Sequence, residues 1–141
     1  MLMPNRLIIL PILSYGSEVW AISKASLDNI DKVFLKFIRS SISVKSTTSN
    51  IIMMGESGQF PPSVSCVISL LKYTNRLHNL AQTMLVKQVY DELVRLNGLG
   101  FQTWVGKVTA LATQFDLKIG TSIKEFSLTC GNSIRSHYVR K

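Results

Sequence analysis

Apolar residues recur at spacings of three and four along most of this chain, and stretches rich in Pro, Gly, Ser and Thr separate the segments that show this spacing. That period places apolar side chains on one face of an α-helix, whereas a half-buried strand needs strict alternation, of which the chain has no convincing example. Of the 141 residues, 46% are hydrophobic, which is enough to bury the core of one domain. The sequence therefore predicts an all-α fold of five or six short helices in an irregular bundle.

The first segment, residues 7–22, is apolar and aromatic and is broken by Pro11 and Gly16. It predicts the end of one helix, a turn and a buried anchor at Trp20. The Ser-, Thr-, Gly- and Pro-rich stretch between Val44 and Pro62 is expected to be a connection with one helical turn inside it. The other helices are expected over residues 26–43, 62–76, 81–97, 103–115 and 122–138.

End signals support these helices. Ser26 and Thr103 are candidate N-caps, Ser122 and Glu125 have the spacing of a capping box, and Gly98 is a candidate stop. Within residues 81–97, Asp91 is positioned to pair with Arg95. The inward positions expected from the period are Ile30, Val33, Phe34, Phe37, Ile38 and Ser41, then Val64, Val67, Ile68 and Leu71, then Leu85, Val86, Val89, Tyr90, Leu93 and Val94, then Trp104, Val105, Val108, Leu111, Ala112 and Phe115, then Ile123, Phe126, Cys130, Ile134 and Tyr138.

The charge balance is strongly basic, with 16 Lys and Arg against 8 Asp and Glu, a formal net charge of +8 and a pI near 9.8. Such an excess favours polyanion partners. In the helix expected over 26–43, Lys32, Lys36 and Arg39 share a narrow sector opposite the apolar face, which suits contact with a phosphate backbone, and Lys24 and Lys45 could extend it. A merely solvated helix face remains the alternative.

Catalytic chemistry is not indicated by the acidic residues. The only adjacent pair, Asp91 and Glu92, is expected on a helix surface, and Asp28 and Asp31 are typical of a helix first turn, where the dipole favours carboxylates, rather than of metal ligation. We therefore expect no two-metal active site.

The other candidate ligands and nucleophiles give no pattern either. His78 and His137 have no partner at a ligand spacing, and Cys66 and Cys130 are isolated on apolar helix faces, where an inert buried thiol is the ordinary outcome. The interpretation is a chain without catalytic residues, metal ligands or cofactor, in a reduced intracellular setting.

The short apolar run from Leu7 to Leu13 resembles the core of a signal peptide, but Pro11 interrupts it and no small-residue cleavage site follows. No stretch approaches the roughly 20 apolar residues that a membrane-spanning helix needs. We expect neither secretion nor membrane insertion, and a nuclear or cytoplasmic location.

Three phrases resemble the region downstream of the palm in reverse transcriptases of LINE-type, non-LTR retrotransposons. Residues 11–20 read Pro-Ile-Leu-Ser-Tyr-Gly-Ser-Glu-Val-Trp, which is similar to a phrase at the end of that family's thumb. Residues 30–37, Ile-Asp-Lys-Val-Phe-Leu-Lys-Phe, resemble its next helix, and 48–50 with 55–61 resemble its Thr-x-Asn and Gly-Glu-Leu-Gly-Arg-Phe-Pro motifs. Residues 103–108 and 133–138 are weaker echoes, and the departures, which indicate a diverged copy, are Ser43, Ser57, Gln59 and Pro62.

The resemblance implies a segment of a larger protein, an RNA-directed DNA polymerase whose catalytic palm and endonuclease lie elsewhere. It divides the chain into a thumb-like end (1–22), a helical linker region with the basic helix (23–97) and a C-terminal helical segment (98–141). It also implies that Tyr15, Gly16, Glu18 and Trp20 are structural, with Gly16 at a turn, Trp20 buried and Glu18 paired with a local donor.

The function expected from these observations is non-catalytic binding of RNA, DNA or their hybrid through Lys32, Lys36 and Arg39, beside the missing palm and thumb domains. Two alternatives remain open. The chain could be a helical protein-interaction module that uses the apolar surface around Leu7–Leu13 and Trp20, or a transposon remnant without function.

Overall fold

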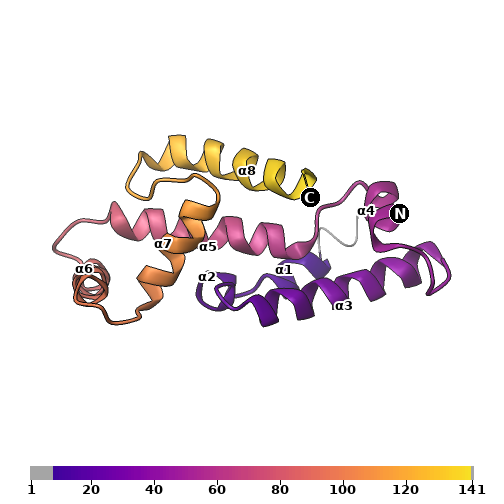
Figure 1. Cartoon of the computed structure of the whole chain (residues 1–141), viewed down its shortest axis with the longest axis horizontal. Helices are drawn as coiled ribbons and strands as arrows, with labels where there is room; N and C mark the ends of the chain where they lie inside the picture. The colour runs from indigo at the N-terminus through magenta and orange to yellow at the C-terminus, as the bar shows by residue number, and fades with distance from the viewer. Residues whose placement is uncertain (1–7, 141) are drawn as a thin grey trace. The chain divides into compact units, whose positions relative to one another are not determined.

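The computed structural model describes residues 8–140, which form eight α-helices and no strand (Figure 1). The all-α prediction is confirmed, although the described helices outnumber the five or six expected, because short helices form where the sequence suggested turns. The chain divides into two compact units, residues 1–67 and 68–141, and the boundary falls within one continuous helix, α5 (Pro62–His78). The motif boundaries at 22/23 and 97/98 stay predictions.

The first unit begins with two single-turn helices, α1 (Leu10–Leu13) and α2 (Ser17–Trp20), followed by the long helix α3 (Lys24–Ile42) and by α4 (Asn50–Ser57). Gly16 lies between α1 and α2 with φ of 68°, a left-handed conformation that glycine adopts without a Cβ clash. Residues 8–13 belong to this unit, whereas Leu7 of the expected apolar run lies outside the described residues.

Two local predictions in this unit are wrong. The N-cap of α3 is Ser23, whose Oγ accepts a hydrogen bond from Ser26 N at 3.4 Å, so the helix begins earlier than expected. The connection after α3 holds α4, a helix of eight residues, instead of a single turn. It buries Met53, and α4 packs against α3.

The core of the first unit lies along one side of α3. Phe34 and Ile38 are completely buried there, as expected, but Val33 is 53% exposed because the packed sector of the helix is narrower than its apolar face. The beginning of α5 contributes Val64 and Val67 to buried positions.

The second unit contains the rest of α5, then α6 (Leu85–Gly98), α7 (Trp104–Gln114) and α8 (Ile123–Val139). Thr103 caps α7 as expected, and its Oγ1 accepts from Gly106 N at 3.3 Å. Ser122 is the N-cap residue of α8, but its side chain makes no capping hydrogen bond, so the expected capping box does not form. The expected inward faces hold for α7, and for α8 except at Ile123, which is 54% exposed.

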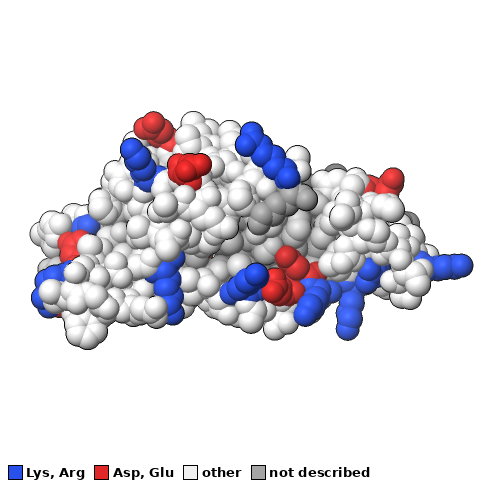
Figure 2. Space-filling view, in the orientation of Figure 1, with Lys and Arg blue, Asp and Glu red and all other residues white. Residues whose placement is uncertain are grey.

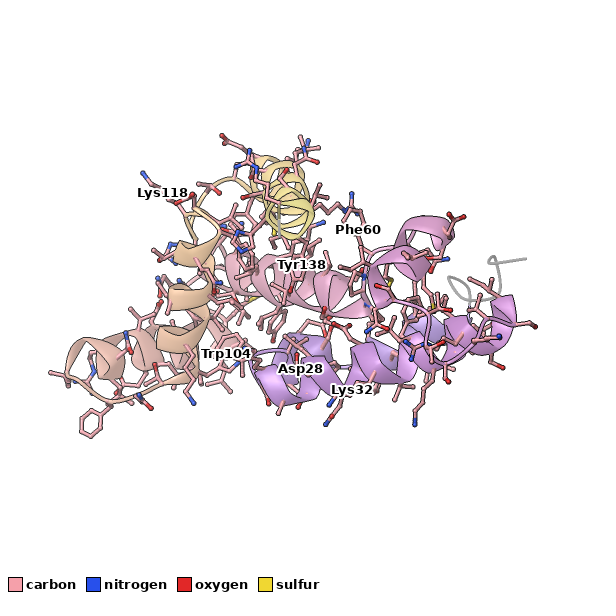
Figure 3. All side chains as sticks on the ribbon, turned by 45° about the vertical axis from the view of Figure 1, so that its right-hand side comes forward. Asp28, Lys32, Phe60, Trp104, Lys118 and Tyr138 are labelled. Carbon is pink, nitrogen blue, oxygen red and sulfur yellow. The ribbon has the colours of Figure 1, made fainter. Side chains whose placement is uncertain are left out.

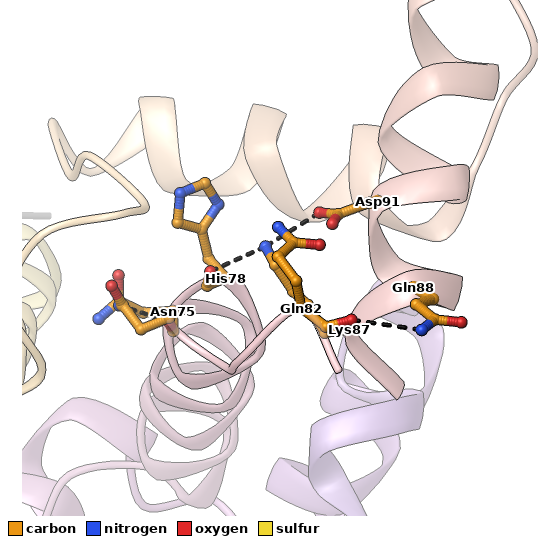
Figure 4. A network of polar contacts seen from close by, with 7 residues as sticks. Asn75, His78, Gln82, Lys87, Gln88 and Asp91 are labelled. Atoms are coloured by element: carbon orange, nitrogen blue, oxygen red, sulfur yellow. Dashed lines mark hydrogen bonds and ion pairs between the residues drawn. The ribbon is translucent and has the colours of Figure 1, made fainter. Parts of the chain in front are cut away.

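The packed face of helix α6 differs from the apolar face that its sequence period predicts. It contacts α7 through Tyr90 and Leu93, while Leu85, Val86 and Val89 are more than half exposed. Lys87 is buried instead, and its Nζ donates to the carbonyl oxygen of His78, at the end of α5, at 2.8 Å (Figure 4).

The charge of Lys87 is compensated locally. Its Nζ lies 2.9 Å from Asp91 Oδ1 and 5.1 Å from the centre of the Tyr90 ring. A cation at the C-terminus of α5 also interacts favourably with that helix's dipole. The expected pair of Asp91 with Arg95 does not form, because Asp91 pairs with Lys87 and Arg95 pairs with Glu92.

A buried asparagine on α5 holds the loop between α7 and α8. Asn75 Oδ1 accepts from Gly120 N at 2.8 Å, and Asn75 Nδ2 donates to the carbonyl oxygen of Thr121 at 3.2 Å. Asn79 Nδ2 donates to the same carbonyl at 3.1 Å. These bonds satisfy loop backbone groups and fix the loop against α5.

Candidate nucleic-acid interface

The basic face of α3 is positioned by the packing of the opposite face. Phe34 and Ile38 are fully buried, and Lys32 and Lys36 are exposed one helical turn apart. Figure 3 shows the Lys32 side chain extending away from the ribbon of α3, with Asp28 on the preceding turn. Neither lysine forms an ion pair within the described residues, so both ammonium groups are available to an anionic ligand.

Acidic groups interrupt this surface. Figure 2 shows Lys and Arg side chains along the α3 side of the first unit with acidic side chains among them. The unit as a whole holds six Lys and Arg against four Asp and Glu. Its field is therefore only moderately positive, and direct contacts matter more than long-range attraction.

Arg39 is placed differently from the two lysines. Its guanidinium Nη2 donates to the carbonyl oxygen of Thr48 at 3.2 Å and to Asn50 Oδ1 at 2.6 Å, and the side chain is half-buried. The residue thus joins the end of α3 to the beginning of α4. Contact of Arg39 with a phosphate stays a prediction, and in the structure its Nη2 donor serves the fold.

Asp31 has a role that its position in the sequence did not suggest. It lies in the third turn of α3 instead of the first, and its carboxylate accepts from Ser63 N at 3.0 Å and from Ser63 Oγ at 2.7 Å. Ser63 is in the first turn of α5, so Asp31 caps that helix from outside. Burial raises the pKa of Asp31, and the two hydrogen bonds from Ser63 oppose that effect.

The family phrase surrounds the turn at Gly16. Trp20 Nε1 donates to the carbonyl oxygen of Tyr15 at 2.9 Å across this turn. The indole is only half-buried, contrary to the expectation of a buried anchor, because Ser17 and Ala21 occupy the buried positions of this segment. Tyr15 is 87% exposed, and Glu18 lies in the first turn of α2, where the helix dipole favours a carboxylate.

The second unit carries most of the basic excess, which sequence reasoning centred on α3 missed. It holds ten Lys and Arg against four Asp and Glu, and two of its cations are already paired with acidic neighbours on α6. Lys72 and Arg76 lie near the end of the helix expected over residues 62–76, outside its apolar positions. A count of charges per compact unit, instead of per motif, would have indicated this region.

The cysteines are buried and free, as expected for thiols on apolar faces. Burial raises the pKa of Cys66, and it raises the pKa of Cys130 to about 11, which disfavours the reactive thiolate in both. Within residues 8–140, no group of three or more His, Cys, Asp or Glu side chains is arranged to hold a metal ion. His78 is exposed, while His137 packs edge-on against Phe115.

Over the same part of the chain, every helix is too short or too polar to cross a lipid bilayer. Comparisons with protein-family models, curated proteins and solved structures find no significant match to the chain. The function therefore has to be argued from the residues themselves.

Proposed function

We propose that this chain is a non-catalytic part of a retrotransposon-derived reverse transcriptase and that it binds the backbone of template and primer without reading their sequence. The observation that carries the binding proposal is the exposure of Lys32 and Lys36 on α3, opposite the buried Phe34 and Ile38. The resemblance of residues 11–20 and 30–37 to LINE-type phrases supports the parent family.

The chemistry of this binding is electrostatic. Each lysine that neutralises a phosphate releases a condensed counterion, so affinity falls as salt rises. Cβ atoms one helical turn apart are about 5 to 6 Å from each other, which lets both ammonium groups follow one backbone. An ammonium group on a flexible stem binds phosphate as a point charge and does not discriminate between bases.

The test is a salt titration of the Lys32→Ala/Lys36→Ala variant with a fluorescent RNA/DNA hybrid. Loss of two phosphate contacts should lower the slope of log affinity against log salt by about 1.4 to 1.8. The control, Lys107→Ala/Arg140→Ala, removes the same charge from exposed positions of the second unit. A slope that does not change, or an equal change in the control, would reject the α3 interface.

A second candidate function is supported by apolar exposure near the start of the described chain. Ile12 and Val19 are each 68% exposed and Tyr15 is 87% exposed, a surface suited to a protein partner. If that surface drives association, the purified protein should elute from a sizing column as an oligomer that persists at high salt, and Ile12→Ser/Val19→Ser should elute as a monomer. Association that disappears at high salt would instead indicate bound nucleic acid.

A further inference from the structure

The exposed side of α5 in the second unit is narrow and basic. Around it, Leu70, Leu71 and Thr74 are completely buried, and Asn75 and Leu77 are less than 8% exposed. Lys72 and Arg76 are the exposed residues of this side, one helical turn apart, and Ser69 precedes them on the same side, half-buried. The burial of the remaining positions fixes where the two cations project.

The loop that Asn75 holds carries a third exposed cation. The bonds from Asn75 to Gly120 and Thr121 hold the loop before α8 against α5, and Lys118 precedes those two residues in the same loop. Lys118 is exposed, and Figure 3 shows its side chain extending outward from this loop. The α5–loop cluster is defined here as Lys72, Arg76 and Lys118.

The positive charges of the α5–loop cluster are not balanced by paired acidic groups. Among the described residues none of its three side chains forms an ion pair or a hydrogen bond, in contrast to Lys87 and Arg95 on α6, which are both paired with acidic neighbours. Like charges one turn apart repel each other and destabilise an isolated helix by a few tenths of a kcal/mol. Because α5 is held by its buried faces, it can keep this unfavourable pair, and a polyanion would relieve the repulsion.

The position of Lys72 relative to α8 supports the same geometry. Burial raises the pKa of the Cys130 thiol on α8, and the positive charge of Lys72 opposes that rise. Lys72 therefore lies close enough to α8 to act on Cys130. Within residues 8–140, no acidic side chain forms an ion pair with the cluster.

We propose that the α5–loop cluster is a second nucleic-acid site, which binds the phosphodiester backbone independently of α3. The inference rests on the proposed nucleic-acid function and assigns it a contact surface in the second unit. Two exposed cations one turn apart on α5 and a third in the loop held by Asn75 suit a phosphate backbone better than a compact small anion, because the three charges are distributed over a helix and a loop.

The experiment uses the full chain and a fluorescent RNA/DNA hybrid between about 50 and about 200 mM salt. The variant Lys72→Ala/Arg76→Ala/Lys118→Ala should bind more weakly, with a slope lower by about 2 to 3. The control Lys107→Ala/Arg135→Ala/Arg140→Ala removes three exposed charges of the same unit from outside the cluster and should change the slope by less than about one.

A charge-conserving variant tests whether charge or side-chain shape matters. Lys72→Arg/Arg76→Lys/Lys118→Arg should keep the wild-type slope. If the triple alanine variant does not fold, as judged by its circular dichroism, the corresponding glutamine variant keeps more of the side-chain stem and is measured instead.

The outcomes separate this inference from the proposed function. If the α3 variant loses slope and the cluster variant does not, the α5–loop cluster is rejected and the α3 interface stands. If the cluster variant and its control lose equal slope, net charge explains the attraction and the inference is also rejected. If the cluster variant loses slope and the α3 variant does not, the second site stands and the α3 interface fails.

Discussion

Removing the Asp31 carboxylate should destabilise the first unit by about 2 kcal/mol. The carboxylate accepts two hydrogen bonds from Ser63, which is 3% exposed, so Asp31→Ala leaves a buried N–H and a buried hydroxyl without their acceptor. Hydrogen bonds to charged groups contribute about 1.5 to 3 kcal/mol net, and relief of carboxylate desolvation offsets part of the loss. Asp28→Ala removes an exposed carboxylate of the same helix and should change stability by less than about 0.5 kcal/mol.

The assay can isolate this unit because each unit contains one tryptophan, Trp20 or Trp104. In a Trp104→Phe background, urea unfolding followed by tryptophan fluorescence reports on the first unit. A double-mutant cycle that combines Asp31→Ala with Ser63→Ala should give a coupling energy of about 1 kcal/mol. The value is small because the Ser63→Ala protein keeps the hydrogen bond from the backbone N–H of residue 63 to Asp31. Equal stabilities of Asp31→Ala and Asp28→Ala would refute the capping role.

The pH dependence gives a further check on the same residue. Burial raises the folded-state pKa of Asp31 above its ordinary value of 3.8, so the folded state binds this proton more tightly than the unfolded chain does. Its protonation therefore contributes stability that is complete below about 3.8 and is lost as the pH rises through the folded-state value. Asp31→Asn should remove this contribution, and an unchanged dependence in acid would argue against burial as the cause.

Three further predictions concern other parts of the fold. Asn75→Ala should destabilise the second unit by about 2 kcal/mol, measured by Trp104 fluorescence in a Trp20→Phe background, because the Gly120 N–H loses its acceptor and the Thr121 carbonyl keeps only the donor from Asn79. A loss below about 0.5 kcal/mol would contradict the clamp. Gly16→Ala should cost about 1 kcal/mol because φ is 68° at that position, and a neutral or stabilising change in urea unfolding would show that the turn is not required. Cys130, whose pKa is raised to about 11, should react with maleimide at pH 8 only after unfolding, and rapid labelling of the folded protein would contradict its burial. The stability contributed by its protonated thiol should decline as the pH rises from about 9 towards about 11.

Local sequence signals predicted helix ends only in part, since Thr103 caps α7 as expected whereas Ser23 replaces Ser26 as the cap of α3 and Ser122 makes no capping hydrogen bond. Thr103 was correctly identified as a cap because capping depends on a residue and its next turn. Helix α6 shows the limit of periodicity, since its apolar face and its packed face differ. Lys87 is buried because the carbonyl of His78 and the carboxylate of Asp91 are both within reach, and those partners are brought there by the fold of the unit.

The candidate interface likewise combines positions that local spacing predicts with contacts that depend on the fold. Spacing correctly placed Lys32 and Lys36 on the exposed side of α3. It could not show that Arg39 would donate to Thr48 and Asn50, because those acceptors lie in the loop and in the next helix. Sequence spacing did not predict the α5–loop cluster either, because its residues lie in two distant segments of the chain that a buried asparagine holds together.

Binding of the wild-type protein to an RNA/DNA hybrid, measured across a salt series on a sample shown to be monodisperse, tests the central claim most directly. The account predicts tight binding whose affinity falls steeply with salt, with a slope of about 3.5 to 4.5 when the two α3 lysines and the three cluster residues each neutralise one phosphate. Absence of binding at about 50 mM salt, or binding whose affinity does not depend on salt, would contradict it.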